Sequence, residues 1–382
     1  MDISPDSSSV PSPPSPAPLP SGLVSPSPLE ISARAFTMPP LVWGSANLAA
    51  APAQVPWLWQ GYLAPGALTV LTSQWKAGKT TLASVLLARM KSGGHLASLP
   101  VTAGKAVVIS EEGLDHWHRR HQQLDFGDHV GWFCRPFRGK PSLGQWSAFL
   151  EGLADLHPRL GFSLVVIDPW AAFLPGDENH AASTLAALAH LQRLTSLGLS
   201  VLLLHHPGKG DPAIGQAARG SGALSGSADI LIEMRFCPGA ADNDRRRRLY
   251  AFSRYPETPR RLVVEWSVDG TDYLSRGTFL EERFSRRWQI LHTIFVEAAH
   301  KLNRHEVCLR WPGGRAPNEV SVGRWLERAV DQGLLRKDGR GLQHNPFRYW
   351  LPEREAVWRQ DPIACCLMPE LLDPAASPDN LP

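Results

Sequence analysis

Four short apolar runs alternate with longer helical stretches between residues 67 and 205. The runs read as buried strands at 67–72, 105–110, 164–168 and 200–205. The segments between them have the apolar spacing of helices, at about 79–92, 115–124, 142–157 and 181–197. Near-continuous apolar strands that alternate with helices are typical of a parallel sheet covered on both faces. The sequence therefore predicts an α/β core.

The alternation stops after residue 229. Further runs follow one another with only turn residues between them, at about 229–235, 247–253, 261–267 and 272–276. Strands joined by short turns pair antiparallel, because a parallel pair needs a long crossover. We therefore expect these runs to form an antiparallel extension of the mainly parallel sheet.

A third pattern begins near residue 285. A helix is expected over 288–302 and a shorter one over 304–311, and Asn318 is expected to cap a third helix that ends near Gln332. Two extended pieces follow, at 334–337 and 347–351. Three helices and a hairpin in this order are typical of a small winged helix-turn-helix domain.

Composition divides the chain into four parts. The first 30 residues contain nine Ser and nine Pro, which predicts a disordered tail or, alternatively, a Pro-rich ligand. We expect a tail over 1–38, an α/β domain over 39–278, a winged helix over 283–351 and a loose acidic tail over 352–382. No repeat is evident.

Charge and cysteine usage narrow the class of protein. The net charge is only +3, but 283–348 holds 13 Lys and Arg against 6 Asp and Glu. The five cysteines form no CxxC pair, which suits a reducing compartment and provides no zinc site. No apolar run approaches a membrane span, and the N-terminus lacks a signal-peptide core. These features predict a cytoplasmic protein that does not enter the membrane.

A phosphate-binding loop follows the first apolar run directly and opens the next helix. It consists of Ser73, Gln74, Trp75, Lys76, Ala77, Gly78, Lys79, Thr80 and Thr81. In such a loop the backbone N–H groups and the helix N-terminus face the phosphates, Lys79 reaches the β- and γ-phosphates, and the Thr80 hydroxyl binds Mg²⁺. Ser73 stands where glycine is usual, so the entry turn must accommodate a Cβ atom. A chance GKT at a helix start is the alternative.

Acidic residues end two of the other apolar runs. Asp168 closes its run and is the candidate Walker B acid, which would hold Mg²⁺ together with Thr80, although any Asp can end a strand. Glu111 is the candidate general base for the attacking water, and Glu112 its supporting neighbour. A pair that only favours the dipole of the following helix is the alternative.

His205 and His206 end the fourth run at the same predicted sheet edge. A polar residue there could sense the γ-phosphate; a buried pair that is merely hydrogen-bonded is the alternative reading. His116, His118 and His121 fit a solvated helix face better than a metal site.

These motifs occur in the order seen in one family. GKTT, ISEE, LVVIDP, LLLHHPGKG and ARGSGAL resemble the ordered motifs of RecA-like P-loop ATPases, and among them the AAA-type and hexameric plasmid replication helicases (RepA-like). The resemblance covers about residues 53–276 and implies ATP and Mg²⁺ as cofactors and a homo-oligomer, with a hexamer as the family's form. It assigns nucleotide binding to Lys79 and Thr80, catalysis to Glu111 and γ-phosphate sensing to His206.

The resemblance also suggests an arginine that acts on the neighbouring subunit. Arg254 matches the strand end where replicative helicases place it, and Arg219 is a second candidate. A guanidinium at the γ-phosphate stabilises transition-state charge. Phe252 replaces the lysine expected two residues before Arg254.

The excess positive charge points to DNA as a partner. Arg324 and Arg328 would face it from the third helix of the winged helix, and Arg336, Lys337 and Arg340 from the wing. A winged helix that binds protein is the alternative. Arg245–Arg248 with Arg260 and Arg261 would line a DNA channel or solvate a hairpin.

Three functions stay open on this basis. The first is an ATP-hydrolysing helicase or DNA motor in replication or repair. The second is a DNA-bound, ATP-dependent regulator or switch that does not unwind DNA. The third is a signalling ATPase whose partners are proteins.

Overall fold

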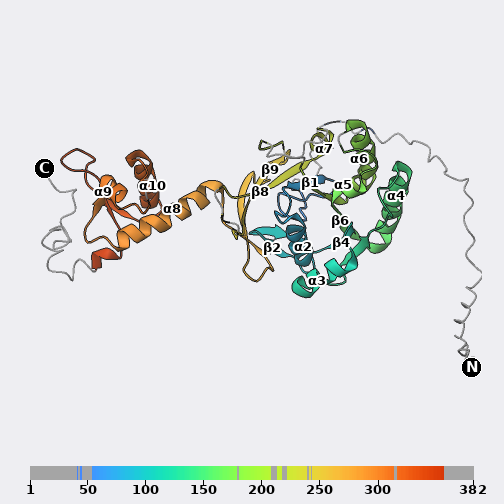
Figure 1. Cartoon of the computed structure of the whole chain (residues 1–382), viewed down its shortest axis with the longest axis horizontal. Helices are drawn as coiled ribbons and strands as arrows, with labels where there is room; N and C mark the ends of the chain where they lie inside the picture. The colour runs from blue at the N-terminus through green and yellow to red at the C-terminus, as the bar shows by residue number, and fades with distance from the viewer. Residues whose placement is uncertain are drawn as a thin grey trace, which may run out of the picture. The chain divides into compact units, whose positions relative to one another are not determined.

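One mixed sheet of nine strands dominates the computed structural model, which describes Leu41, Gly44 and residues 54–356 except 179, 208–212, 217–221, 239–240, 242 and 314–315. In order across the sheet the strands are β11 (Tyr273–Ser275), β10 (Arg261–Trp266), β9 (Arg246–Ser253), β8 (Ile230–Phe236), β1 (Leu68–Ser73), β7 (Ser200–His205), β6 (Phe162–Asp168), β4 (Lys105–Ser110) and β5 (Val130–Cys134). The predicted α/β class with a mostly parallel sheet is confirmed (Figure 1).

The parallel part of the sheet is larger than expected. From β8 to β5 all neighbouring strands pair in parallel, and only β9, β10 and β11 pair antiparallel. The sequence placed β8 wholly in the antiparallel extension. This is correct for its pairing with β9 but wrong for its other neighbour, because β8 pairs in parallel with β1. The segment between β7 and β8 is long enough for a crossover, and it includes α7 (Ala223–Ser227). The edge strand β5 and the hairpin of β2 (Gly94–Leu96) and β3 (Leu99–Val101) were not predicted.

Helices cover both faces of the sheet. One face packs against α2 (Lys79–Arg89), α3 (Leu114–Leu124) and the segment 57–64. The other packs against α4 (Leu143–Leu160), α5 (Trp170–Phe173), α6 (Ala181–Ser196) and α7. Successive residues of β6 point to opposite faces of the sheet. Leu164 packs in the core on the α2 and α3 side, and Val165 packs in the core on the α4 and α6 side. Both faces of these strands are therefore apolar.

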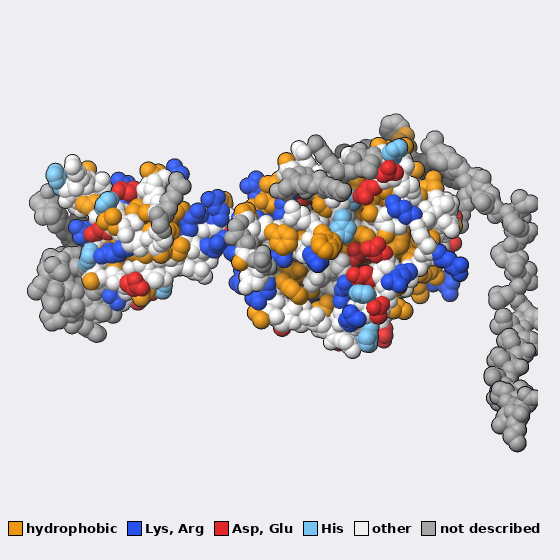
Figure 2. Space-filling model, in the orientation of Figure 1, with side chains coloured by type: hydrophobic (Ala, Val, Ile, Leu, Met, Phe, Trp, Pro, Cys, Tyr) orange, Lys and Arg blue, Asp and Glu red, His pale blue; other side chains and the backbone are white. Residues whose placement is uncertain are grey.

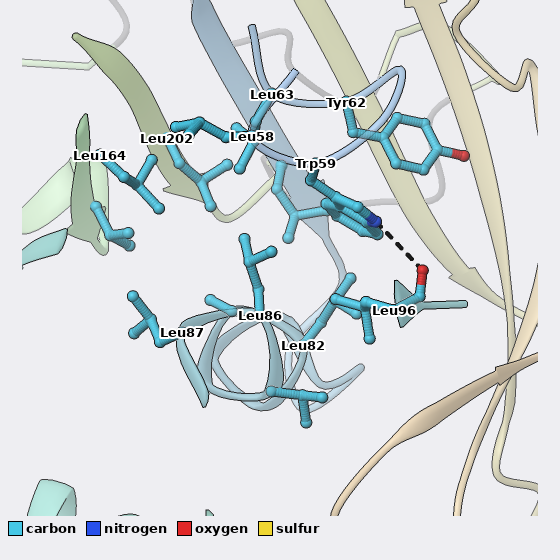
Figure 3. Packing of buried hydrophobic residues seen from close by; sticks show 14 of the residues in the cluster. Leu58, Trp59, Tyr62, Leu63, Leu82, Leu86, Leu87, Leu96, Leu164 and Leu202 are labelled. Carbon is cyan, nitrogen blue, oxygen red and sulfur yellow. Dashed lines mark hydrogen bonds between the residues drawn. The ribbon is translucent and has the colours of Figure 1, made fainter. Parts of the chain in front are cut away.

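The packing of α2 positions the loop that precedes it. Leu82, Leu86 and Leu87 lie on its inner side, toward leucines of β6 and β7 and of the segment 57–64 (Figure 3). The Trp59 indole donates to the carbonyl of Leu96 at 3.3 Å, which ties that segment to the β2–β3 hairpin. The N-terminus of α2 is thereby held at the carboxyl end of β1.

The last part of the described chain has a core of its own. It comprises α8 (Phe279–Val296), α9 (Arg304–Leu309), α10 (Glu319–Asp331) and a three-stranded sheet in the order β12 (Leu302–Asn303), β14 (Arg348–Trp350), β13 (Arg336–Asp338). Leu291, Phe295, Val322 and Leu326 are buried in this core. As predicted, the Asn318 side chain caps α10, accepting from the Ser321 N–H at 2.8 Å.

Two predicted regions fall outside this description. The Ser/Pro-rich tail (1–38) and the acidic tail from residue 357 onward lie outside the described residues. Among the residues that are described, no helix has both the length and the apolar character required to cross a bilayer.

Candidate functional site

The predicted phosphate loop lies between the carboxyl end of β1 and the first turn of α2. Gly78 has a φ of 105°, and a Cβ atom there would come within 2.9 Å of the Tyr273 hydroxyl oxygen, so glycine is required on both counts. Ser73 is the last residue of β1 and does not have a positive φ. The expectation of a turn at position 73 is therefore wrong, and the Cβ atom of Ser73 causes no backbone strain.

Lys79 is folded back onto the start of this loop. Its ammonium donates to the Ser73 carbonyl and to the Ser73 hydroxyl, both at 3.1 Å. Only 5% of Lys79 is exposed, and burial lowers its pKa to about 8, while Asp168 acts in the opposite direction. Ser73 therefore supplies acceptors that hold the lysine beside the loop.

Thr80 and Asp168 bring two oxygen donors together. The Thr80 hydroxyl donates to a carboxylate oxygen of Asp168 at 2.7 Å. Asp168 is buried at the end of β6, and burial raises the pKa of its carboxyl to about 6, opposed by the bond from Thr80. Hydroxyl and carboxylate oxygens are ligands that Mg²⁺ prefers. The donor set fits the predicted magnesium ion.

Glu111 and Glu112 follow β4, which lies next to β6 in the sheet. Glu112 forms a two-point ion pair with Arg120 on α3. Within the described part of the chain the Glu111 carboxylate has no ion-pair or hydrogen-bond partner, and its pKa is raised by burial and then by Glu112. The two glutamates therefore differ: Arg120 holds the Glu112 carboxylate, whereas the Glu111 carboxylate, the predicted general base, is unpaired among the described residues.

The two histidines at the end of β7 also separate. His205 is buried and bonds to Glu178 at 2.6 Å and to the Thr72 hydroxyl at 3.2 Å. His206 places Nδ1 at 3.1 Å from the Lys79 ammonium. Burial and then Lys79 lower the pKa of His206, so its neutral ring accepts a hydrogen bond from the Lys79 ammonium. His206, the predicted sensor, therefore contacts the loop, while His205 fits the alternative of a buried, hydrogen-bonded residue.

Arg254 lies away from this site in its own chain. It follows β9 directly, its side chain is 80% exposed, and its nearest ion-pair partner is Asp229 at 4.0 Å. Asp229 also accepts from the backbone N–H of Leu68, at the start of β1. Arg254 therefore lies near the amino end of β1, whereas the phosphate loop follows the carboxyl end of that strand. The other candidate, Arg219, lies outside the described residues.

Arg247 is a site residue that the sequence reasoning missed. Its Nε donates to the Ala77 carbonyl of the phosphate loop at 2.9 Å, and its guanidinium lies 4.3 Å from the centre of the Phe236 ring. Its neighbour Arg246 pairs with Asp244 and with Glu282 on α8, each at 2.6 Å. The sequence shows a run of arginines at 245–248, but it does not show that Arg247 contacts Ala77 in the phosphate loop, 170 residues away.

Several residues predicted to face DNA have partners within the chain. Arg336 pairs with Glu355 at 2.9 Å, and Lys337 with Glu327 at 2.8 Å. Arg328 lies over the Phe284 ring at 4.6 Å. Arg324 and Arg340 are exposed. Two of the five charges assigned to this surface, those of Arg336 and Lys337, are therefore balanced by neighbouring carboxylates.

Comparison with known proteins supports an ATPase reading of the sheet-containing part. Residues 32–212 match a family model described as an AAA domain. This segment contains the phosphate loop, Glu111, Asp168 and His206. The match supports an AAA-type ATPase domain there.

A solved structure titled "ATPase Domain of G40P" is similar to the chain. It has 12% sequence identity and a TM-score of 0.45, and the comparison covers 60% of this chain and 94% of that one. A search of curated proteins found no match.

Proposed function

We propose that the protein is an oligomeric, Mg²⁺-dependent ATPase that acts on DNA as a helicase or DNA motor. The observation that carries the ATPase part is the meeting of Lys79, Thr80 and Asp168 at the ends of two parallel strands. Lys79 Nζ lies 3.1 Å from the loop entry, and Thr80 lies 2.7 Å from Asp168. This is the edge where ligands bind in open parallel sheets.

The proposed reaction is attack of water on the γ-phosphorus of ATP. Lys79 would exchange its bonds to Ser73 for phosphate oxygens. Thr80 and Asp168 would hold Mg²⁺, whose charge offsets that of the phosphates. The bond between the γ-phosphorus and the β–γ bridging oxygen breaks, so the products are ADP and phosphate.

Glu111 would take the proton from the attacking water. Its open carboxylate and raised pKa suit a general base, whereas Glu112 is occupied by Arg120. Binding of a γ-phosphate to Lys79 would remove the ammonium from His206 Nδ1. His206 would then report the presence of ATP to the chain that follows β7.

An exposed arginine at the opposite sheet edge supports an assembly of subunits. Arg254 would stabilise the transition state in a neighbouring subunit, because the loop of its own chain lies at the other end of β1. We further propose that 279–351 is the winged helix that the sequence predicted. Its three helices are followed by the strands β13 and β14, and the third strand of the small sheet, β12, lies between α8 and α9.

ATPase measurements test the enzymatic part. Lys79→Ala should abolish phosphate release and binding of a fluorescent ATP analogue, while Arg254→Ala should abolish hydrolysis and keep binding. Lys91→Ala, which removes an exposed lysine just after α2, is the matched control and should behave as wild type. Full activity in a strictly monomeric preparation would contradict the assembly.

A DNA-bound switch is the second candidate. The separate core of the last three helices favours it, because such a part can bind DNA without coupling hydrolysis to unwinding. A strand-displacement assay on a tailed duplex with ATP distinguishes the two. Displacement that requires Lys79 supports the motor, and ATP-dependent binding without displacement supports the switch.

A further inference from the structure

A groove between α8 and α10 gathers positive charge that the described part of the chain leaves largely without acidic partners. We call it the arginine groove, and its volume is about 790 Å³. Its lining includes Arg283, Arg286, Arg287, Trp311, Ser321 and Trp325. Lys and Arg side chains gather over α8 on the visible face (Figure 2). Arg286 and Arg287 stand three and four positions after Arg283, so each of them neighbours Arg283 on the helix surface.

The electrostatics of this groove favour an anionic partner. No Asp or Glu is among its described lining residues. The nearest carboxylate, Glu282, is 3.8 Å from Arg286 but is buried and binds Arg246 at 2.6 Å. Burial lowers the pKa of Arg287, and its neighbours Arg283 and Arg286 lower it further. Mutual repulsion of this kind is relieved when phosphates bind.

The groove differs in this respect from the surface that the sequence assigned to DNA. There Arg336 and Lys337 already bind Glu355 and Glu327. A phosphate that binds Arg336 or Lys337 must first break one of these ion pairs, and that cost reduces the free energy of binding. The arginine groove carries no such cost, apart from the long contact of Arg286 with Glu282.

Two tryptophans in the groove add a second kind of contact. The rings of Trp311 and Trp325 are 5.5 Å apart, and the Arg287 guanidinium lies 4.3 Å from the centre of the Trp325 ring. Bases stack on aromatic and guanidinium planes when they are unpaired, whereas a duplex buries its base faces. Trp311 and Trp325 are half-buried, and arginines beside the ring surface that stays accessible favour a single strand over a duplex.

We infer that the arginine groove binds single-stranded nucleic acid, with arginines on the phosphates and tryptophans against the bases. The inference rests on the proposed action on DNA and names the surface and strand form that it uses. Binding in the arginine groove does not depend on ATP hydrolysis, so the inference and the proposed ATPase activity can fail separately.

The test measures binding of the full chain to labelled single-stranded dT20 and to a hairpin duplex by fluorescence anisotropy, over a range of salt. Arg283→Gln with Arg286→Gln removes two phosphate contacts and should lower the salt slope for dT20 by about 1.4. Because salt changes tenfold between 1 M and 0.1 M, the variant should gain about 25-fold less affinity for dT20 over that range than wild type does. Arg324→Gln with Arg340→Gln removes the same charge from the predicted surface and should leave dT20 binding nearly unchanged.

A stacking contact has its own readout. A 20-mer with abasic sites should bind about tenfold more weakly than dT20, and Trp311→Ala should narrow that difference. Thermal melting and ATPase activity of each variant show that it is folded.

Each other outcome counts against the inference. If the Arg324/Arg340 variant loses binding and the groove variant keeps it, the helix α10 and wing surface is the site instead. If a poly-glutamate peptide binds as tightly as dT20 and is lost in the groove variant, the partner is an acidic protein. If wild type binds no nucleic acid at low salt but hydrolyses ATP, both the inference and the DNA part of the proposal are wrong while the ATPase stands.

Discussion

Replacing Lys79 by methionine should stabilise the nucleotide-free protein while removing nucleotide binding. The ammonium is nearly buried, and its pKa falls from 10.5 to about 8. Each unit of pKa corresponds to about 1.4 kcal/mol, so at pH 7 the charge makes folding about 3 kcal/mol less favourable. Methionine has a similar length and no charge, but it leaves the two Ser73 acceptors and His206 Nδ1 without their donor. That loss costs about 1–2 kcal/mol, which leaves a net gain of about 1–2 kcal/mol.

The pH dependence gives this prediction a sign that can be checked. The pKa of Lys79 is lower in the folded protein than in the unfolded chain, so the unfolded chain holds more protons between about pH 8 and 10.5. Wild-type stability should therefore rise with pH across this window, and the advantage of Lys79→Met should shrink. Below pH 8 the full cost of the buried charge is present.

Urea denaturation without nucleotide is the appropriate assay, with the midpoint and slope compared at pH 7 and 9.5. Lys91→Met replaces an exposed lysine that pairs with Asp125 and should change the free energy of unfolding by less than about 0.5 kcal/mol. A Lys79→Met variant less stable than wild type at pH 7, or an advantage that grows with pH, would refute the reasoning. Such a gain in stability at the expense of function is expected where a binding site holds a group in an unfavourable setting.

Three further predictions follow from other contacts of the site. Arg247→Lys removes the bond from Nε to the Ala77 carbonyl and should weaken ATP-analogue binding about tenfold in a titration, and unchanged binding would show that this contact does not position the loop. Glu111→Gln should keep analogue binding but lower kcat by about 10²–10⁴, and Glu112→Gln should lower it less; the reverse order would exchange their roles. The pKa of His206 is lowered by folding, so wild type should lose stability as pH falls below about 6.5, and His206→Gln should lose less over the same range in urea melts.

Much of the architecture was predictable because it depends on local pattern. The strand at 105–110 was predicted with its observed bounds, and β7 likewise. The cap at Asn318 was predicted from one side chain and its neighbours. Alternation of apolar runs and helices determines that the sheet is covered on both faces, since a strand that is apolar on both sides must be buried on both. Because parallel strands end at the same side of the sheet, the positions of Glu111 and Asp168 after their predicted strands already indicate that they lie near the phosphate loop.

Partners that are distant in the sequence were decided only by the tertiary structure. The pairing of β8 with β1 depends on where the crossover after β7 returns, which no local pattern encodes. Arg247 meets Ala77, and His206 meets Lys79, across 170 and 127 residues respectively. Glu355 and Glu327 neutralise cations that the sequence counted as available for DNA. Net charge over a segment sums its residues, whereas binding depends on which of those charges remain unpaired after folding.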